Sequence, residues 1–379
     1  MIDKVAKDCT GCCACGDKCP VGAIKFRYNS EGFTYPIINN DICTQCQLCE
    51  HICPVLSLEE GHSKLASYAS FSYSKPEESS SGGMFYSLAS AVLVDNGVVY
   101  GAAFNTNMKL SHVRVTNVEE LRKLCGSKYV QSDCSGIYKM VQNDLKVGTK
   151  VLFSGTPCQV SGLKKFLHKN YDSLYTIDLI CHGVPSPGIF SEWVTYCENL
   201  RKKRVVDFKT RDNRDGWDNR FRSTLIYDNG KEEYNTMLSN LWNRIFFSEL
   251  ALRHSCSNCK FASIKRQGDI TLGDFWGIEN VCPESYHKGG VSLLQINTIK
   301  GQTLFDAISD NVRIAEASTT EKEHPNLYYP TYPNPQREQF MSDYFQHGFE
   351  FVLKKYFGYT RWLDFKVRLK ALLNNLIEG

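Results

Sequence analysis

The chain has 379 residues, and its 42% hydrophobic and 22% charged content is typical of a globular protein rather than a disordered or fibrous one. A net charge of +3 gives no sign of the strongly basic surface that nucleic-acid binding needs, so we expect no nucleic-acid partner. The length exceeds what one hydrophobic core usually organises, and we expect more than one domain.

The number and positions of the cysteines indicate which class of protein this is. Seventeen cysteines are present, and nine of them precede residue 54. The first residues, MIDKVAKDC, contain no apolar signal-peptide core, and the chain contains no run of about 18 apolar residues. We therefore expect a cytoplasmic protein, in which thiols serve metals or redox chemistry more often than disulfides.

One cysteine pattern occurs twice within residues 1–60. CTGCCACGDKCP and CTQCQLCEHICP both read Cys-x2-Cys-x2-Cys-x3-Cys-Pro, the bacterial ferredoxin signature. Three thiolates on a tight loop hold three corners of a [4Fe–4S] cube, and the fourth cysteine, held apart before a proline, ligates the other cluster. The repeat predicts one cluster on Cys9, Cys12, Cys15 and Cys53, and a second on Cys43, Cys46, Cys49 and Cys19.

Zinc sites are the alternative interpretation of these eight cysteines. Two identical four-cysteine runs that both end in proline fit zinc poorly. Cys13 lies between ligands and is expected to bind no metal, and the residues between the runs predict a hairpin turning at 29–32. Residues 1–60 are therefore predicted to form a ferredoxin-like domain with two clusters.

The next segment changes in character. Residues 61–83 are rich in serine and glycine and are predicted to be a linker. Ser81, Gly82 and Gly83 then precede MFYSLASAVLVDNG, which has the pattern of an amphipathic helix. Free backbone N–H groups and the helix dipole at such an N-terminus suit a phosphate group, and glycine permits close approach. A flexible linker with an ordinary helix cap explains the same residues equally well.

Residues 84–320 alternate strand-like and helical stretches, which predicts an α/β domain. Cys158 in VLFSGTPCQVSGL and Cys181 in LICHGVPSPGIF follow predicted strands, where α/β folds gather their sites. With Cys256 and Cys259 of SCSNC they number four thiols, enough for a third [4Fe–4S] cluster. From spacing alone, a zinc site or inert thiols remain open. No G-x-G-x-x-G follows a strand, so a nicotinamide site is not expected.

Seven stretches follow the ferredoxin repeat in a fixed order: SSGGMFYSLASAVLVDNG, GSKYVQS, GTPCQVSGL, CHGVPSP, RDGW, C-x-x-C and GDITLGDFWG. Together with the repeat, this order of motifs resembles the coenzyme F420 hydrogenase and dehydrogenase beta-subunit family. The resemblance extends over about residues 1–300. It implies an α/β fold (α+β overall): a small dicluster domain, then a larger α/β flavin- and cluster-binding domain with a helical C-terminal tail. It also implies FAD and an inner [4Fe–4S] cluster, with electrons passing between the clusters and the flavin.

The resemblance also implies roles for particular residues. The family's cluster cysteines fall on Cys158, Cys181, Cys256 and Cys259. Its flavin-binding positions fall on Ser81, Gly82, Gly83, Ser127, Lys128, Tyr129 and Thr156. Arg211, Arg214 and Trp217 would lie near a substrate face, or in an exposed polar loop, and Asp274 would orient a cofactor edge or cap a turn. His182, beside Cys181, is the candidate catalytic acid, and a structural histidine is the alternative.

These expectations combine into one function. The chain is predicted to be an iron–sulfur flavoprotein oxidoreductase that exchanges electrons with a ferredoxin-like redox protein and with an organic substrate or a deazaflavin such as coenzyme F420. The competing hypothesis is a non-enzymatic electron-transfer or docking subunit without its own flavin. Residues 321–379 are predicted to be a C-terminal helical extension, whose alternating basic and apolar residues suit either weak contact with a membrane surface or packing onto the chain's own domain.

Overall fold

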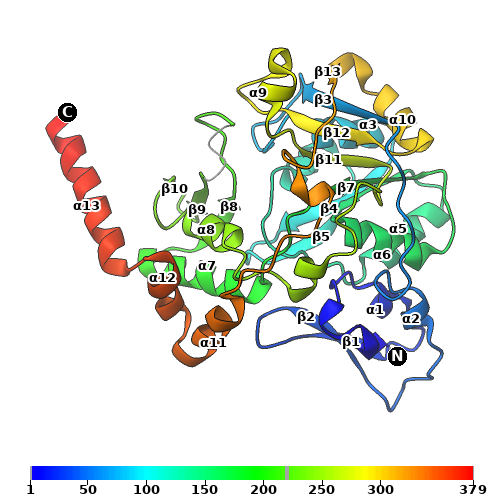
Figure 1. The fold of residues 1–379 in the computed structure, drawn as a ribbon, viewed down its shortest axis with the longest axis horizontal. Coiled ribbons are helices and arrows are strands. Elements are labelled where there is room, and N and C mark those ends of the chain that lie inside the picture. The colour runs from blue at the N-terminus through cyan, green and yellow to red at the C-terminus, as the bar shows by residue number, and fades with distance from the viewer. Residues whose placement is uncertain (1, 218–221, 379) are drawn as a thin grey trace.

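The computed structural model describes residues 2–217 and 222–378 (Figure 1). Its largest unit is a mixed eight-stranded sheet in the order β13-β3-β12-β11-β7-β6-β4-β5. The strands are β3 (Ala66–Ser72), β4 (Val98–Phe104), β5 (Leu110–Val115), β6 (Val151–Gly155), β7 (Leu174–Leu179), β11 (Ile270–Asp274), β12 (Ser292–Ile296) and β13 (Val312–Glu316). β4, β6, β7 and β11 pair in parallel, and the strands on either side of them join antiparallel.

Alternate residues of the central strands pack into two different cores. In β6, Val151 and Phe153 belong to the core on one face, and Leu152 belongs to the core on the other. The helices α5 (Ile137–Lys146) and α6 (Pro157–Leu167) cover the first face, and α3 (Met84–Val94) and α10 (Ile299–Asp306) cover the second. Because both faces are buried, β6 is apolar on both sides, as parallel strands usually are.

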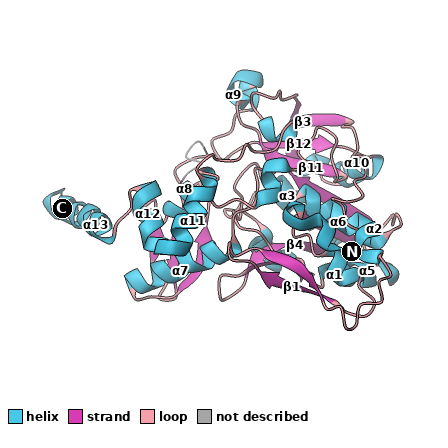
Figure 2. Ribbon diagram, turned by 60° about the horizontal axis from the view of Figure 1, so that its bottom comes forward, coloured by secondary structure: helices cyan, strands magenta, loops and turns pink. Residues whose placement is uncertain are grey.

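The N-terminal domain lies against the α5 and α6 side of the sheet (Figures 1 and 2). It contains η1 (Ile2–Asp8), α1 (Ala14–Lys18), the hairpin of β1 (Ile24–Tyr28) and β2 (Thr34–Ile38), and α2 (Leu48–His51). The buried Asp17 carboxylate of α1 accepts hydrogen bonds of 2.7 and 3.1 Å from the backbone N–H groups of Gly136 and Tyr138, at the start of α5. A negative charge at a helix N-terminus is favourable, so this contact holds the two domains together.

A second lobe extends from the large sheet (Figure 1). It contains α7 (Pro187–Arg201), the sheet of β8 (Val205–Lys209), β9 (Thr224–Tyr227) and β10 (Glu232–Tyr234), and α8 (Leu241–Phe247). The C-terminal helices α11 (Arg337–His347) and α12 (Phe349–Phe357) pack onto the same core, around the buried Trp193 and Trp242. The helices α11 and α12 are therefore part of this lobe, whereas Leu327 belongs to a separate core with Ala69 of β3 and Phe275.

The prediction of a linker at residues 61–83 is wrong for β3, which lies inside the large sheet between β13 and β12. Serines obscure the strand pattern, because the Ser70 and Ser72 hydroxyls are buried but hydrogen-bonded. The Ser70 hydroxyl donates to the Ser292 carbonyl at 3.0 Å, and the Ser72 and Ser87 hydroxyls lie 2.6 Å apart. Small polar side chains thus replace apolar ones where helix α3 packs closely on the sheet.

The last helix, α13 (Arg361–Glu378), projects away from the lobe (Figures 1 and 2). Asp364 anchors its first turn through an ion pair of 2.8 Å with Arg201, while Trp362 and Phe365 are exposed. The apolar side chains of Trp362 and Phe365, in the first turns of α13, therefore do not pack onto the rest of the chain. Among the described residues, no helix has the length and apolar content that crossing a membrane requires.

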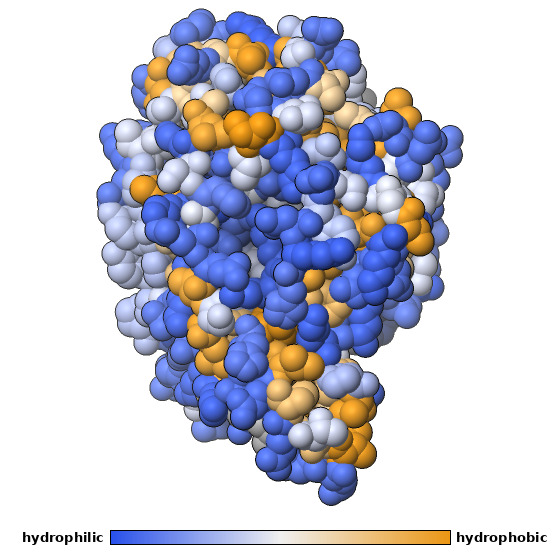
Figure 3. Space-filling view, turned by 90° about the vertical axis from the view of Figure 1, so that its right-hand side faces the viewer, coloured by the Kyte–Doolittle hydropathy of each residue, from blue (hydrophilic) through white to orange (hydrophobic). Residues whose placement is uncertain are grey.

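Figure 3 shows one side of the molecule, on which hydrophilic residues predominate and apolar residues gather only in scattered patches. The remaining short helices connect the larger elements. They are α4 (Val118–Leu121), η2 (Arg122–Leu124), η3 (His254–Asn258), α9 (Ile278–Val281), η4 (Pro283–Ser285), η5 (Ser309–Asn311) and η6 (Pro325–Leu327).

Candidate redox centre

The cysteines predicted to hold the first ferredoxin cluster lie together. Cys9, Cys12, Cys15 and Cys53 line one small cavity between η1 and α1. All four are buried. Burial raises the pKa of the Cys12 thiol well above its ordinary value, and the neighbouring thiols of Cys9 and Cys53 add to this. The tertiary fold thus brings Cys53, from the second run, to the three cysteines of the first.

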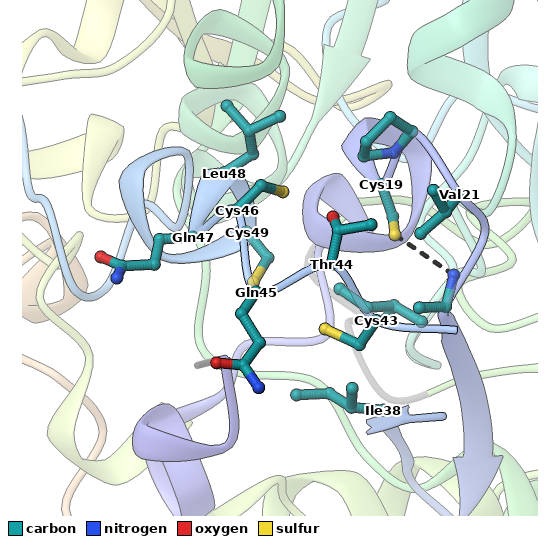
Figure 4. A pocket seen from close by; sticks show the side chains of 13 residues that line it. Cys19, Val21, Ile38, Cys43, Thr44, Gln45, Cys46, Gln47, Leu48 and Cys49 are labelled. Carbon is teal, nitrogen blue, oxygen red and sulfur yellow. Dashed lines mark hydrogen bonds between the residues drawn. The ribbon is translucent and has the colours of Figure 1, made fainter. Parts of the chain in front are cut away.

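The cysteines predicted for the second cluster form a matching group. Cys19, Cys43, Cys46 and Cys49 line another cavity (Figure 4). The Cys19 sulfur accepts a hydrogen bond of 3.2 Å from the Ala23 backbone N–H, which Figure 4 draws as a dashed line. Cys46 is exposed, and backbone hydrogen bonding at Leu48 lowers the pKa of its thiol. This group is therefore the more accessible of the two.

Cys13 lies outside both patterns, as expected, although it borders the first cavity. Its backbone adopts φ 67° at the start of α1, and its thiol donates to the Gly11 carbonyl at 3.4 Å. The Ser135 hydroxyl lies 3.5 Å from its sulfur, and burial raises its thiol pKa to about 12. The Cys13 thiol thus hydrogen-bonds to the protein, and its lack of a role in metal binding stays a prediction.

The four cysteines of the predicted inner group come from three elements. Cys158 lies in the first turn of α6, after β6, and Cys181 follows β7. Since β6 and β7 are adjacent and parallel, their carboxyl ends meet at one edge of the sheet. Cys256 lies in η3, and Cys259 ends it. The Cys256 sulfur accepts a hydrogen bond of 3.4 Å from the Val184 N–H, which brings η3 to the segment after β7.

Electrostatics indicates that these four thiols are mutual neighbours. Burial raises the pKa of the Cys181 thiol well above its ordinary value, and Cys256, Cys158 and Cys259 raise it further. Burial likewise raises the pKa of Cys158 to about 11, with Cys259 as the next cause. Within the described part of the chain, however, no three metal-binding side chains are close enough to hold a single ion.

A cavity of about 520 Å³ adjoins the inner cysteine group, within the range of small-molecule sites. Its walls come from the start of α3, the loop after η2, the ends of β6 and β7, helix α8 and residues 323–326. Cys181 lines it, as do most of the candidate cofactor and catalytic residues. Those are Ser81, Gly83, Ser127, Lys128, Tyr129, Thr156 and His182.

Two serine-containing segments meet at this cavity. The Ser80 hydroxyl accepts a hydrogen bond of 2.7 Å from the Ser127 N–H, which joins the segment before α3 to the loop after η2. The Ser81 hydroxyl donates to the Val291 carbonyl at 2.9 Å. Gly83 precedes α3 with φ 82°, a conformation that favours glycine. The start of α3 therefore faces the cavity with its free backbone N–H groups.

Gly82 differs from its neighbours because it does not line the cavity. A Cβ atom there would lie 2.4 Å from the Ser70 carbonyl oxygen and 2.7 Å from the Ser292 nitrogen. Glycine is thus required at this position so that the loop can pack against β3 and β12.

Lys128 and Tyr129 form the wall opposite. The Lys128 ammonium donates to the Cys125 carbonyl at 2.6 Å and to the Gly126 carbonyl at 3.2 Å, and burial lowers its pKa to about 8. Tyr129 stacks on Phe246 of α8 with ring centroids 4.3 Å apart. The cavity therefore offers a cationic group and an aromatic face close together.

Thr156 connects the cavity to the inner cysteine group. It begins α6 in a capping box with Gln159, whose side-chain oxygen accepts from the Thr156 N–H at 3.0 Å. The Thr156 hydroxyl lies 3.2 Å from the Cys158 sulfur. The same turn thus orients a cysteine and lines the cavity.

His182 lies between the two sites. Its Nδ1 lies 3.3 Å from the Asn326 side-chain oxygen, and its Nε2 lies 3.4 Å from a Glu249 carboxylate oxygen. Its ring meets Phe246 edge-on, with centroids 5.3 Å apart. It therefore has partners that orient it, and it lines the cavity from the chain position next to Cys181.

Within the segment RDNRDGWDNR, the side chains of Arg211, Arg214 and Trp217 have different hydrogen-bond and ion-pair partners. The buried Arg211 guanidinium forms an ion pair of 2.5 Å with Asp274, and the Trp217 ring N–H donates to the same carboxylate at 3.1 Å. Asp274 lines the cavity. Arg214 instead pairs with Asp212 and Glu232. Only part of this segment therefore supports the cavity wall.

Several cavity residues are absent from the sequence predictions. Phe246, Phe247, Trp276 and His324 line it. His324 is 4% exposed, its Nε2 has no hydrogen-bond partner among the described residues, and burial lowers its pKa to about 4. Trp276 lies in the quoted GDITLGDFWG stretch, just after β11, whereas Phe246, Phe247 and His324 reach the cavity only through the packing of the second lobe and of residues 321–327.

A further network supports the cavity floor. His112 of β5 lies with its Nε2 3.0 Å from the Ser154 carbonyl and its Nδ1 3.0 Å from the Ser132 hydroxyl. Gln159 donates to the same hydroxyl at 2.9 Å. Burial lowers the pKa of His112 to about 4, so its ring is neutral at pH 7 and rigidly held.

The residues present fit the expected cofactors. Seventeen free cysteines include the three gathered groups, and thiolates are the ligands of iron–sulfur clusters. The cavity volume, the start of α3, the ammonium of Lys128 and the aromatic wall match the needs of a flavin with its phosphates.

Comparison with known proteins agrees with this architecture. Residues 148–322 match the C-terminal region of the coenzyme F420 hydrogenase/dehydrogenase beta subunit, and residues 8–56 match a 4Fe-4S dicluster domain. The match to the beta-subunit model covers less than half of the chain and follows the dicluster match. The predicted resemblance to this family, the dicluster domain and the mixed fold are thus confirmed.

Individual relatives match over different parts of the chain. The coenzyme F420-dependent sulfite reductase of Methanocaldococcus jannaschii is 24% identical over 316 residues, which cover 79% of this chain and 46% of that protein. The chain thus spans about half the length of this relative. Ferredoxin-3 of Chlorobaculum tepidum is 35% identical over 60 residues, covering 14% of this chain and 89% of that protein.

A chain in a solved structure of the F420-reducing [NiFe] hydrogenase complex from Methanosarcina barkeri is also similar. It is 13% identical with a TM-score of 0.46, over 67% of this chain and 83% of that chain.

Proposed function

We propose that this chain is an iron–sulfur flavoprotein oxidoreductase that binds three [4Fe–4S] clusters and FAD and reduces or oxidises an organic substrate. One observation carries the proposal: Cys181 of the inner cysteine group lines the same cavity as the candidate flavin residues. A redox cofactor in the cavity would thus be next to the inner cluster.

When bound, [4Fe–4S] clusters supply single-electron transfer, and FAD supplies the conversion between single electrons and hydride chemistry. The residues of the chain would hold these groups in order. Cys46 is exposed, Cys12 is buried, and the half-buried Cys181 lines the cavity. The exposure of Cys46 supports electron exchange with a redox protein at the second cysteine group, and the position of Cys181 supports exchange with the substrate at the cavity.

Residues of the cavity would bind and orient FAD. Ser81, Gly83 and the start of α3 offer N–H groups to a phosphate, and Lys128 offers a positive charge. Tyr129, stacked on Phe246, offers a flat surface to a ring system. Ser127 and Thr156 extend the polar wall.

His182 would hold or donate a proton to the organic substrate. It lines the cavity, and Asn326 and Glu249 orient its ring. A substrate that takes up two electrons usually needs a proton as well, and an imidazole that lines the cavity can donate one. A deazaflavin such as coenzyme F420 is the proposed substrate class, because the relative from M. jannaschii is named for dependence on this coenzyme.

The first experiment measures iron and flavin in protein purified without oxygen. We expect about twelve irons and one FAD per chain. Replacing both Cys256 and Cys259 with serine should remove about a third of the iron and leave the two ferredoxin signals in the electron paramagnetic resonance (EPR) spectrum. An iron content of about twelve in this double variant would refute the inner cluster.

Flavin content separates the enzyme from a purely electron-transferring subunit. Protein with iron and sulfide but no bound flavin, even after incubation with FAD, would refute the flavoenzyme proposal. An anaerobic assay with reduced ferredoxin as donor and coenzyme F420 as acceptor then tests the substrate, and a flavin-containing protein that fails to reduce F420 would refute the deazaflavin assignment alone.

A further inference from the structure

Arg253 is a buried cation at the boundary between the ferredoxin domain and the large domain. Its side chain is 1% exposed. Its Nε donates to the Cys9 carbonyl at 2.6 Å, its Nη2 to the Thr34 carbonyl at 3.0 Å, and its Nη1 to the Gln131 side-chain oxygen at 2.9 Å. The guanidinium thus joins the first cysteine loop, the β1–β2 hairpin and the large domain.

The same residue is tied to the inner cysteine group. Its backbone N–H donates to the Val184 carbonyl at 2.9 Å, and its carbonyl accepts from the Cys256 N–H at 2.9 Å. Arg253 therefore contacts the loop of the inner group through its backbone and the Cys9 backbone through its side chain.

The guanidinium has no ion-pair partner among the described residues. Its three acceptors are uncharged oxygens, and no described carboxylate lies within ion-pair distance of it. The Tyr35 ring, 4.3 Å from the guanidinium carbon, is a further uncharged neighbour. Burying an unpaired charge costs several kcal/mol, so buried cations normally have an anion close by.

The neighbouring Arg337 makes the contrast clear. It is also buried and contacts the same region, donating to the Leu252 carbonyl at 3.0 Å. It forms an ion pair of 2.6 Å with Glu31 of the hairpin. One of these two adjacent arginines is thus neutralised by a carboxylate, and the other lies between two groups of cysteines.

We propose that Arg253 is the electrostatic bridge between the first ferredoxin cluster and the inner cluster: its charge is paired by their thiolates and raises both reduction potentials. This inference rests on the proposed function, because it requires the inner cluster. In the transfer step one electron leaves the cluster on the first group and enters the cluster on the inner group, with no bond formed or broken. The added negative charge remains beside the guanidinium, which stabilises it.

The test is a redox titration, followed by EPR, of anaerobically purified protein with dithionite as reductant. In Arg253→Gln, both potentials should become more negative, by about a tenfold change in the reduction equilibrium, or 59 mV for a one-electron couple. Arg253→Lys keeps the charge and should shift them less. The second cysteine group, farther from Arg253, should keep its potential.

A second variant keeps Arg253 and places a carboxylate beside its guanidinium group, so that the positive charge is neutralised. Gln131→Glu puts a carboxylate where an amide oxygen already accepts from Nη1, so the same two potentials should fall as in Arg253→Gln. This variant tests the charge even if Arg253→Gln fails to fold. The double variant Glu31→Gln with Arg337→Gln is the matched control: it removes a buried arginine together with its carboxylate partner, so the local net charge and the two potentials should not change.

The outcomes separate this inference from the proposed function. An iron content of about eight in the wild type would refute the inner cluster and the proposed function with it. About twelve irons with unchanged potentials in Gln131→Glu would refute the role of Arg253 alone. Equal shifts in Arg253→Gln and in the charge-neutral double variant Glu31→Gln with Arg337→Gln would also refute it, because they would show a general effect of disturbed packing.

Discussion

The Ser80 hydroxyl accepts a hydrogen bond of 2.7 Å from the Ser127 backbone N–H and so joins the two segments that face each other across the cavity. Ser80 is 8% exposed. Replacing it with alanine leaves a largely buried N–H without its partner, which costs about 1–3 kcal/mol. We expect Ser80→Ala to lower the free energy of unfolding by this amount and to lower FAD occupancy.

Thermal denaturation and flavin content measure these two effects. Ser90→Ala is the control, because the Ser90 hydroxyl is buried without a hydrogen-bond partner among the described residues. Its removal should be neutral or slightly stabilising. Equal losses of stability in both variants would contradict the assigned role of the Ser80 bond.

Adjacent cysteines should differ in their effect on iron binding. Cys12→Ser should remove the first ferredoxin cluster, about a third of the iron, because Cys12 lies in the cavity with Cys9 and Cys15. Cys13→Ser should leave the iron content unchanged, since the Cys13 thiol hydrogen-bonds to protein instead. Iron analysis with EPR checks both, and loss of a cluster in Cys13→Ser would show that the ligand assignment is wrong.

His324 should make the protein sensitive to acid. Burial lowers its folded-state pKa from 6.5 to about 4, against the weaker opposing effect of Asp274. Between these pH values the unfolded chain binds a proton that the folded chain does not, so stability falls as the pH falls. The loss should reach about 3 kcal/mol near pH 4.

Denaturation by urea at several pH values measures this slope. His324→Gln should show a shallower decline below pH 6.5 than the wild type. His347→Gln, at an exposed position, should follow the wild type. Identical slopes in wild type and His324→Gln would contradict a neutral buried imidazole at this site.

Arg201 should be important for the stability of the second lobe. It forms ion pairs of 2.7 Å with Glu233 and 2.8 Å with Asp364, all three side chains being at most 10% exposed. Arg201→Met leaves two buried carboxylates unpaired and should cost about 3–5 kcal/mol. Chemical denaturation measures the loss. A change below about 1 kcal/mol would mean that the pairs behave like exposed ones.

The sequence by itself determined the ferredoxin domain and the chemistry of the chain. Ligands such as Cys9, Cys12 and Cys15 are adjacent in sequence because one tight loop must present them together, so a local pattern records them. The strand ends after β6 and β7 were also readable, since a buried parallel strand is a continuous apolar run that stops at Gly and Pro.

Only the tertiary structure decided how distant segments meet. Cys158, Cys181 and the pair at 256 and 259 become neighbours through strand order, which local spacing does not encode. β3 escaped prediction because its buried serines depend on partners in β12 and α3. The aromatic wall of the cavity and the buried charge of Arg253 likewise depend on contacts between residues more than a hundred positions apart. A short stretch of sequence does not show which distant residues it will contact.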